Sequence, residues 1–372
     1  MLQAPKQILA PGDRAPNFVL PDHDGKLTMF YDRVSGRPVV LLFAGEFQPP
    51  ILPSPLLAFE AEASRFEAEG VDVFCVSLAA SAAVRAMLPN MRLWSDPERK
   101  ITEACLNQLG FGGCGALKDG NVIGVLLDPN QRVLTVMSSN AGDLAREVLD
   151  FYAGRPAPPA PQVRKSTAPV IIIPELLDLK MCAALIQHFE QGKVEEGTVG
   201  SVLAGQELTR VHHDRKKRLD NKIEDPALLR ILSNVIGRRM APEVSKAFNF
   251  QGFKFDRFLV CRYAADREDR FRTHRDNVSP ETADRRFAMT LNLNGDEYEG
   301  GELVFPEYGA DRYKPGNGGA VVFSCSLLHE ALPVTKGVRY ALLTFLRAPS
   351  GPGADTNTKP WLPPTSTPGA AG

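Results

Sequence analysis

A proline-rich segment divides this chain into two parts with different sequence patterns. Residues 154–169 read GRPAPPAPQVRKSTAP, in which five prolines and three basic residues interrupt regularly patterned sequence. Proline-rich segments of this kind form extended linkers. The chain has 372 residues, which at roughly 150 residues per domain suggests two domains, and we expect them at 1–153 and 170–347. A Pro- and Gly-rich stretch at 348–372 is predicted to be a disordered tail.

The composition narrows the class of protein. It is 44% hydrophobic and 23% charged, with 43 Lys and Arg against 44 Asp and Glu, so no overall field would attract nucleic acid or an anionic membrane. We therefore expect partners of neither kind. The first residues lack an apolar signal segment, no run of about 18 apolar residues occurs, and the six cysteines are scattered. These features predict a cytoplasmic protein with reduced thiols.

The first part has the pattern of an α/β domain. Its apolar runs predict buried strands, and they lie at 38–43, 71–78, 122–127 and 133–137. Helical patterns occupy 56–69 and 141–152. The last two strands flank a turn signal, Asp128-Pro129-Asn130, which predicts a hairpin. Strand, helix, strand, hairpin and helix in this order predict a thioredoxin-like α/β domain.

The second part begins with helices and continues with strands. One helix face is predicted from apolar residues at helical spacing, namely Leu176, Leu177, Leu179, Cys182, Leu185, Ile186 and Phe189. A second helical stretch begins at Pro226. Short β-rich runs follow at 257–263, 287–293, 302–305, 320–324 and 340–345. This order predicts a mainly-β, jelly-roll double sheet buttressed by helices.

The segment Thr273-His-Arg-Asp-Asn277 is the sharpest candidate for a metal site. Alternate residues of a strand point to the same side, so His274 and Asp276 can offer ligands to one ion, with His329 as a third. Two histidines and one carboxylate leave the other octahedral positions open, as in non-haem Fe(II) oxygenases. An isolated His-x-Asp is common by chance, and the alternative is a turn-capping Asp beside a surface His.

The flanking sequence favours the metal-site interpretation. Arg339 follows His329 by ten residues, within HEALPVTKGVRY, and its guanidinium suits a bidentate carboxylate partner. Upstream lie YEGGELVFP at 298–306 and KPGNGGAVVFS at 314–324.

In this order the blocks resemble the catalytic domain of Fe(II)/2-oxoglutarate-dependent dioxygenases, in the prolyl 4-hydroxylase-like branch, over about residues 170 to 347. The resemblance implies a double-stranded β-helix with iron held by His274, Asp276 and His329. It also implies that Arg339 pairs with the distal carboxylate of 2-oxoglutarate, and that Tyr263 forms a hydrogen bond to this co-substrate.

The same resemblance implies hydroxylation of an unactivated C–H bond, with O2 and 2-oxoglutarate consumed and succinate and CO2 released. Ascorbate is a further candidate cofactor. The substrate is expected to be either a prolyl residue in a protein or a small molecule, between which the sequence does not choose.

A basic stretch precedes the strands of the second part. Residues 211–220 read VHHDRKKRLD, and we expect His212 and His213 to be solvated surface residues and the run 215–218 to be a solvated turn. The alternative is that this run recruits an acidic substrate or closes as a lid.

The start of the chain resembles the peroxiredoxins of the AhpC/TSA type. The matching segments are PGDRAPNFVLPDHDG at 11–25 and GRPVVLLF at 36–43, and the resemblance extends to about Tyr152. A peroxidase needs a low-pKa cysteine at the start of the next helix, assisted by a threonine and an arginine. Here Ile51 or a neighbour stands at the cysteine position, and Gln48 stands at the threonine position.

We therefore expect a redoxin fold without peroxidase chemistry, which docks a partner, mediates self-association or positions the substrate of the second domain. Two alternative functions stay open. One is a thiol-dependent redox protein acting through Cys105 and Cys114. The other is a non-catalytic interaction protein that binds iron and 2-oxoglutarate without turnover.

Overall fold

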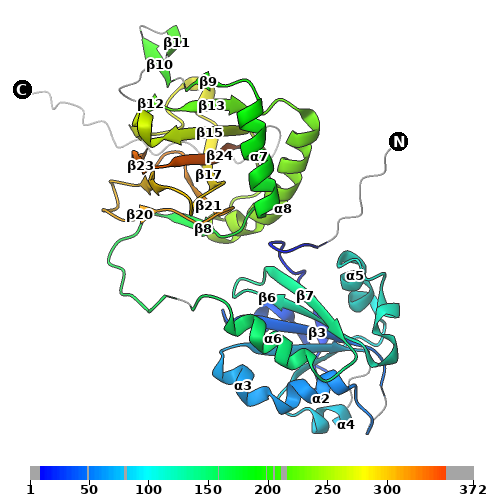
Figure 1. The fold of residues 1–372 in the computed structure, drawn as a ribbon. Helices are drawn as coiled ribbons and strands as arrows, with labels where there is room; N and C mark the ends of the chain where they lie inside the picture. The colour runs from blue at the N-terminus through cyan, green and yellow to red at the C-terminus, as the bar shows by residue number, and fades with distance from the viewer. Residues whose placement is uncertain are drawn as a thin grey trace, which may run out of the picture. The chain divides into compact units, whose positions relative to one another are not determined.

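The computed structural model describes residues 9–47, 50–78, 82–157, 159–197, 199–203, 206–210 and 216–348. The chain divides into two compact units, Met1–Val163 and Arg164–Gly372, shown in Figure 1. The division falls inside the proline-rich segment. Several predictions concern positions outside the described residues: those for Gln48, His212, His213, Arg215 and the tail beyond Ala348.

The first unit is built on a five-stranded sheet in the order β5-β4-β3-β6-β7. Its strands are β3 (Val39–Ala44), β4 (Asp72–Ser77), β5 (Arg92–Ser95), β6 (Val122–Leu127) and β7 (Val133–Ser139). β3, β4 and β5 are parallel, whereas β6 pairs antiparallel with both β3 and β7. The hairpin predicted at Asp128-Pro129-Asn130 is thus present between β6 and β7.

Helices lie before, between and after these strands. They are α1 (Phe30–Arg33), α2 (Ser54–Ala61), α3 (Ala63–Ala68), α4 (Ala82–Met87), α5 (Lys100–Gln108), the 3-10 helix η1 (Cys114–Gly120) and α6 (Leu144–Ala153). A small hairpin of β1 (Val19–Pro21) and β2 (Leu27–Met29) precedes them. The predicted thioredoxin-like α/β architecture is confirmed.

The central strand β3 explains how the sequence builds this unit. All six of its residues are buried, and alternate side chains enter two separate cores. Val40 and Leu42 pack with the residues of α2 and α6, whereas Leu41 and Phe43 pack on the opposite face. The helix expected at 56–69 is two helices, because Glu62 between them leaves the helical conformation, with φ −93° and ψ 8°.

An aromatic cluster fills the second of these cores. Phe74 stacks on Trp94 with ring centroids 5.1 Å apart, and Phe18 stacks on Phe30 at the same distance. The indole Nε1 of Trp94 donates a hydrogen bond of 2.8 Å to the Thr28 hydroxyl. The buried polar atom of the indole is therefore satisfied, and the ring is held in one orientation.

We expect Phe74→Ala to lower the free energy of unfolding of the first unit by about 3–5 kcal/mol, because it leaves a cavity beside Trp94. Leu27→Ala is the matched control, since Leu27 is 69% exposed and its removal should change stability by less than about 0.5 kcal/mol. Denaturant unfolding followed by Trp94 fluorescence measures both. Equal midpoints for the two variants would contradict this account of the core.

The second unit is a double sheet. The larger sheet has the order β8-β21-β17-β24-β15-β13-β9, with β14 also paired to β24, and the smaller has the order β12-β16-β22-β19-β20. The larger sheet contains β8 (Val170–Ile173), β9 (Glu195–Glu196), β13 (Leu219–Lys222), β14 (Lys254–Phe255), β15 (Leu259–Ala264), β17 (Arg285–Asn292), β21 (Ala320–Ser324) and β24 (Val338–Arg347).

The smaller sheet is made of short strands. They are β12 (Lys216–Lys217), β16 (Arg270–His274), β19 (Leu303–Val304), β20 (Arg312–Tyr313) and β22 (His329–Ala331). Two further antiparallel pairs join β10 (Val199–Leu203) to β11 (Gln206–Arg210) and β18 (Glu299–Gly300) to β23 (Val334–Lys336). Short 3-10 turns, η2 (Ala265–Arg267) and η3 (Pro280–Thr282), lie in loops.

Two helices cover the outer face of the larger sheet (Figure 1): α7 (Leu179–Gln191) and α8 (Pro226–Phe248). α7 begins later than the apolar spacing predicted, because the Asp178 side chain caps it by accepting a 2.8 Å hydrogen bond from the first turn. Leu176 and Leu177 therefore precede the helix, although both are buried. α8 begins at Pro226, as expected.

The space between the two sheets is partly filled and partly open. Ala288 and Phe323 of the larger sheet pack with Leu303 and Phe305 from the region of the smaller sheet. The predicted jelly-roll, buttressed by helices, is confirmed. Within the described residues, no helix has the length and apolar character needed to span a membrane.

Candidate metal centre

His274, Asp276 and His329 meet between the two sheets. His274 ends β16 and His329 begins β22, and the two residues are register partners with ring centroids 4.2 Å apart. Asp276 lies 3.5 Å from Nε2 of His274 and 3.4 Å from Nε2 of His329, through Oδ1 and Oδ2 respectively. One ligand atom from each residue lies within 4.8 Å of the others.

The expected position of Asp276, on the same strand as His274, differs from the one observed. Asp276 is not part of a strand, because β16 ends at His274. Instead, the backbone N–H of Asp276 donates a 3.0 Å hydrogen bond to the carbonyl of Cys325. This bond turns the loop so that the carboxylate faces both imidazoles.

Each imidazole is oriented by a backbone carbonyl two residues before it. Nδ1 of His274 lies 2.8 Å from the carbonyl oxygen of Arg272, and Nδ1 of His329 lies 3.0 Å from that of Leu327. Because a carbonyl only accepts hydrogen bonds, Nδ1 carries the hydrogen in both rings. Nε2 of each ring therefore faces the Asp276 carboxylate and, in the neutral ring, offers its lone pair to a metal ion. The carbonyls act as the outer partners that fix a ligating histidine.

The protonation states also suit a metal ligand set. Burial alone would raise the pKa of Asp276, but the adjacent His329 and His274 hold this pKa below its usual value. Burial lowers the pKa of His329, with Asp276 opposing the shift. A carboxylate and a neutral imidazole are the forms that bind metal. This donor set fits Fe(II) and leaves coordination positions open.

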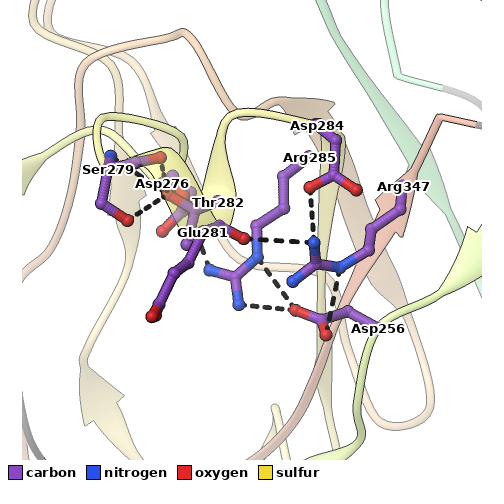
Figure 2. Close-up of polar contacts among 8 residues, drawn as sticks. All are labelled: Asp256, Asp276, Ser279, Glu281, Thr282, Asp284, Arg285 and Arg347. Atoms are coloured by element: carbon purple, nitrogen blue, oxygen red, sulfur yellow. Dashed lines mark hydrogen bonds and ion pairs between the residues drawn. The ribbon is translucent and has the colours of Figure 1, made fainter.

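A network of ion pairs holds the loop that follows Asp276 (Figure 2). Arg285, the first residue of β17, lies with Nη1 3.5 Å from the carbonyl oxygen of Asp276 and donates from Nε to Asp256 at 3.0 Å. Arg347, the last residue of β24, pairs with the other oxygen of Asp256 at 3.2 Å. Asp256 thus ties two strand ends of the larger sheet to the backbone of a candidate ligand.

The rest of the loop is closed locally. Ser279 and Thr282 form a capping box at η3. Arg347 donates a 3.1 Å hydrogen bond to the carbonyl of Glu281 and a further one to Asp284, as Figure 2 shows. The segment from Asp276 to Arg285 is therefore fixed at both ends and in the middle.

One pocket is lined by His274, Asp276 and His329 and also by Arg339. Arg339 in β24 is the register partner of Tyr263 in the neighbouring strand β15. Its guanidinium lies 5.1 Å from the centre of the Tyr263 ring. Arg339 is only 4% exposed and donates to Asn292 at 3.3 Å and to Thr290 at 3.2 Å. Among the described residues, no carboxylate forms an ion pair with it. The pocket therefore holds a buried cation without a protein counterion.

Two functional candidates, Lys216 and Arg218, were not predicted from the sequence. The expectation that this basic run is a solvated turn is wrong for both, since their side chains are 8% and 5% exposed. Lys216 is in β12, which pairs with β16, and Arg218 lies between β12 and β13, which pairs with β15. Alternate residues of this extended segment put Lys216, Arg218 and Asp220 on one face. The spacing of two cations and an acid at i, i+2 and i+4 was the available signal.

The first unit shows no activated thiol. Ile51 stands before α2 and is 79% exposed. All six cysteines are free, and burial raises the pKa of each. The pKa of Cys105 rises to about 12 and that of Cys114 to about 11. A reactive cysteine needs a lowered pKa, so neither thiol has the environment of a nucleophile.

Comparison with known families agrees with this division of the chain. Residues 258–347 match the family model of the 2OG-Fe(II) oxygenase superfamily, and residues 11–106 match that of the AhpC/TSA family. A PKHD-type hydroxylase of Shewanella sp. (strain MR-7) is 34% identical over 142 residues, covering 36% of this chain and 60% of that protein. Procollagen-lysine,2-oxoglutarate 5-dioxygenase 1 of Rattus norvegicus is 35% identical over 97 residues, covering 25% of this chain and 12% of that protein.

The chain thus spans less than two thirds of the length of these relatives. Among solved structures, a Pseudomonas putida prolyl-4-hydroxylase is 18% identical, with a TM-score of 0.38, and the match covers 50% of this chain and 95% of that one. Peroxidoxin BcpB of Mycobacterium tuberculosis is 24% identical, with a TM-score of 0.34, and the match covers 40% and 99%.

We expect His274→Ala to abolish stoichiometric binding of Fe(II), because it removes one of three ligand atoms while leaving the strand pairing of β16 unchanged. His188→Ala, on α7, is the matched control and should bind the metal as the wild type does. Anaerobic titration with Fe(II), followed by measurement of bound metal after desalting, tests both. Undiminished binding by His274→Ala would remove this residue from the ligand set.

We expect Asp256→Asn to lower the free energy of unfolding by about 2–3 kcal/mol, because it weakens charged hydrogen bonds to Arg285 and an ion pair to Arg347. Metal affinity should fall as well, since Arg285 also supports the loop of Asp276. Glu299→Gln breaks an exposed pair with Lys336 and should cost less than about 1 kcal/mol. Denaturant unfolding followed by circular dichroism, together with metal titration, distinguishes the two. Unchanged metal affinity in a destabilised Asp256→Asn would limit the network to a structural role.

Proposed function

We propose that the second unit is an Fe(II)- and 2-oxoglutarate-dependent hydroxylase, on the premise that residues 258–347 belong to the 2OG-Fe(II) oxygenase superfamily. The observation that carries the proposal is Arg339, a buried cation that forms no ion pair within the described part of the chain, in the same pocket as His274, Asp276 and His329. A buried charge needs a partner. A dicarboxylate that also reaches the metal supplies one.

The polar residues of the pocket have two roles, metal binding and carboxylate binding. His274, Asp276 and His329 would hold Fe(II), which supplies coordination sites for a keto acid and O2 and the means to oxidise a C–H bond. Arg339 binds the distal carboxylate of 2-oxoglutarate with a fixed guanidinium, and Thr290 and Asn292 hold that guanidinium in place.

The remaining pocket lining is mainly apolar. Phe271, Phe323 and Phe345 line it together with Leu303 and Leu343. These side chains restrict water near the charged groups, which strengthens the ion pair to Arg339. In the overall reaction one oxygen atom of O2 enters the substrate as hydroxyl, and the other enters succinate as CO2 leaves 2-oxoglutarate. Ascorbate would serve as an auxiliary reductant.

The substrate in this proposal is a prolyl residue of a protein or a small molecule. The first unit contributes by docking a partner, by self-association or by positioning that substrate, and it works without thiol chemistry. The domain limits 1–153 and 170–347, with 154–169 as linker, belong to the same proposal. The thiol-dependent alternative is disfavoured by the raised pKa values of Cys105 and Cys114.

The proposal predicts a metal-to-ligand charge-transfer band when 2-oxoglutarate is added anaerobically to the protein loaded with Fe(II). The band should be absent in His274→Ala. Arg339→Gln should weaken the binding of 2-oxoglutarate about ten-fold or more, because a charged hydrogen bond is lost, and Arg339→Lys should recover part of the loss. Arg312→Gln, on β20 with its side chain 63% exposed, should bind normally.

Succinate release in the presence of O2 and substrate candidates then separates the two functions that involve this site. A band with succinate release supports the hydroxylase. A band without release for any candidate, under conditions where a known enzyme of this kind turns over, favours the non-catalytic binding protein. Absence of the band with iron bound would contradict both.

A further inference from the structure

Arg218 is a buried cation of the same pocket that lies outside the residues matching the oxygenase family. It lies between β12 and β13, and its guanidinium donates from Nη1 to the hydroxyl of Tyr263 at 2.6 Å. The guanidinium also lies 5.5 Å from the centre of the Tyr263 ring. Arg218 therefore contacts the tyrosine for which the family resemblance implies a hydrogen bond to the co-substrate.

Asp220 fixes the position of this guanidinium. Its Oδ1 lies 2.7 Å from Nε of Arg218, and its Oδ2 accepts from Nη2 at 3.2 Å. Lys216 pairs with the same carboxylate at 3.2 Å. Burial opposes ionisation of Asp220, but Arg218 and Lys216 lower its pKa to about 2. Asp220 is therefore charged at neutral pH and holds Arg218 in one orientation.

The hydrogen bond from Arg218 determines that the Tyr263 hydroxyl acts as the acceptor in this contact. A tyrosine hydroxyl has one hydrogen and can accept further bonds, whereas arginine only donates. Tyr263 must therefore accept from Arg218, which leaves its own hydrogen for another acceptor. Burial raises the pKa of Tyr263, with Arg218 opposing the shift, so the hydrogen is retained at neutral pH.

The described protein groups supply no acceptor for this hydrogen. Among the hydrogen bonds of the described residues none is donated by Tyr263, and Arg339 on its other side is also a pure donor. Tyr263 is 2% exposed and lines the pocket. Since the described residues offer no acceptor, a molecule bound in that pocket can supply one.

We propose that Arg218, held by Asp220, is a positioning residue that turns the Tyr263 hydroxyl hydrogen toward the bound co-substrate. Tyr263 then donates to an anionic or carbonyl oxygen, and a ligand presenting a donor at that point is rejected. This inference rests on the proposed function and deepens it. It assigns part of the selectivity for an oxygen-rich keto acid to Arg218 and Asp220, which lie outside residues 258–347 that match the oxygenase family. Arg218 acts through Tyr263 and does not itself bind the ligand.

A double-mutant cycle tests this indirect action. The full chain is loaded with Mn(II) in place of Fe(II) and titrated calorimetrically with 2-oxoglutarate. Tyr263→Phe and Arg218→Gln should each weaken binding by about ten-fold, and the double variant should be no weaker than the worse single variant. Arg218→Lys should recover part of the loss, because lysine, unlike glutamine, keeps the positive charge that pairs with Asp220 and can still donate to Tyr263. Arg312→Gln is the matched control.

Two measurements keep the test decisive. Mn(II) affinity and circular dichroism show whether Arg218→Gln retains the fold. If it does not, Arg218→Met, which keeps most of the side-chain volume and leaves the Lys216–Asp220 pair intact, takes its place in the cycle. Binding losses that add, or an Arg218 variant that binds as the wild type does, would overturn the positioning role.

The cycle also separates this inference from the proposed function. If the wild type binds 2-oxoglutarate and Arg339→Gln weakens it, the proposed function stands whatever the result at Arg218. If the wild type does not bind 2-oxoglutarate, the proposed function fails and the role of Arg218 fails with it.

Discussion

The pairing of β16 with β22 is the constraint on which the candidate site depends. It places His274 directly opposite His329, while the pairing of β15 with β24 in the other sheet places Tyr263 opposite Arg339. A shift of one residue in either register would turn these side chains to the opposite face. The strand pairings that define these registers therefore also set the distances between functional groups.

The balance of buried charge is the second constraint. Arg218 and Lys216 share one carboxylate, Asp220, so this cluster is stable without a ligand but carries an excess of positive charge. Arg339 is held by neutral groups, Thr290 and Asn292. Both features leave the pocket electropositive apart from Asp276 beside the histidines. In the proposed function, a dianion that also reaches a metal ion held by His274 and His329 would neutralise this positive charge.

The sequence predicted the parts of this arrangement that follow from local pattern. Strands such as β3 and β21 were recognisable because continuous apolar runs bury both faces, and α8 because Pro226 marks its first turn. The candidate ligands were recognisable by residue type and spacing. The later start of α7 could not be recognised from the sequence. Leu176 and Leu177 are buried by tertiary packing, so in the hydrophobic pattern they resemble residues of the helix.

Arg218 shows why the rest could not be predicted. Four basic residues within a stretch of five are usually a solvated face, and only the pairing of β12 and β13 with two different sheets turns Lys216 and Arg218 inward. Long-range pairing of this kind leaves no periodic signal in so short a segment. The same pairing brings Arg218 to Tyr263, 45 residues later in the chain. A charged residue that tertiary structure buries beside a ligand pocket has a desolvation cost that solvent-facing positions would avoid, and the hydrogen bond to Tyr263 is the interaction that offsets part of this cost.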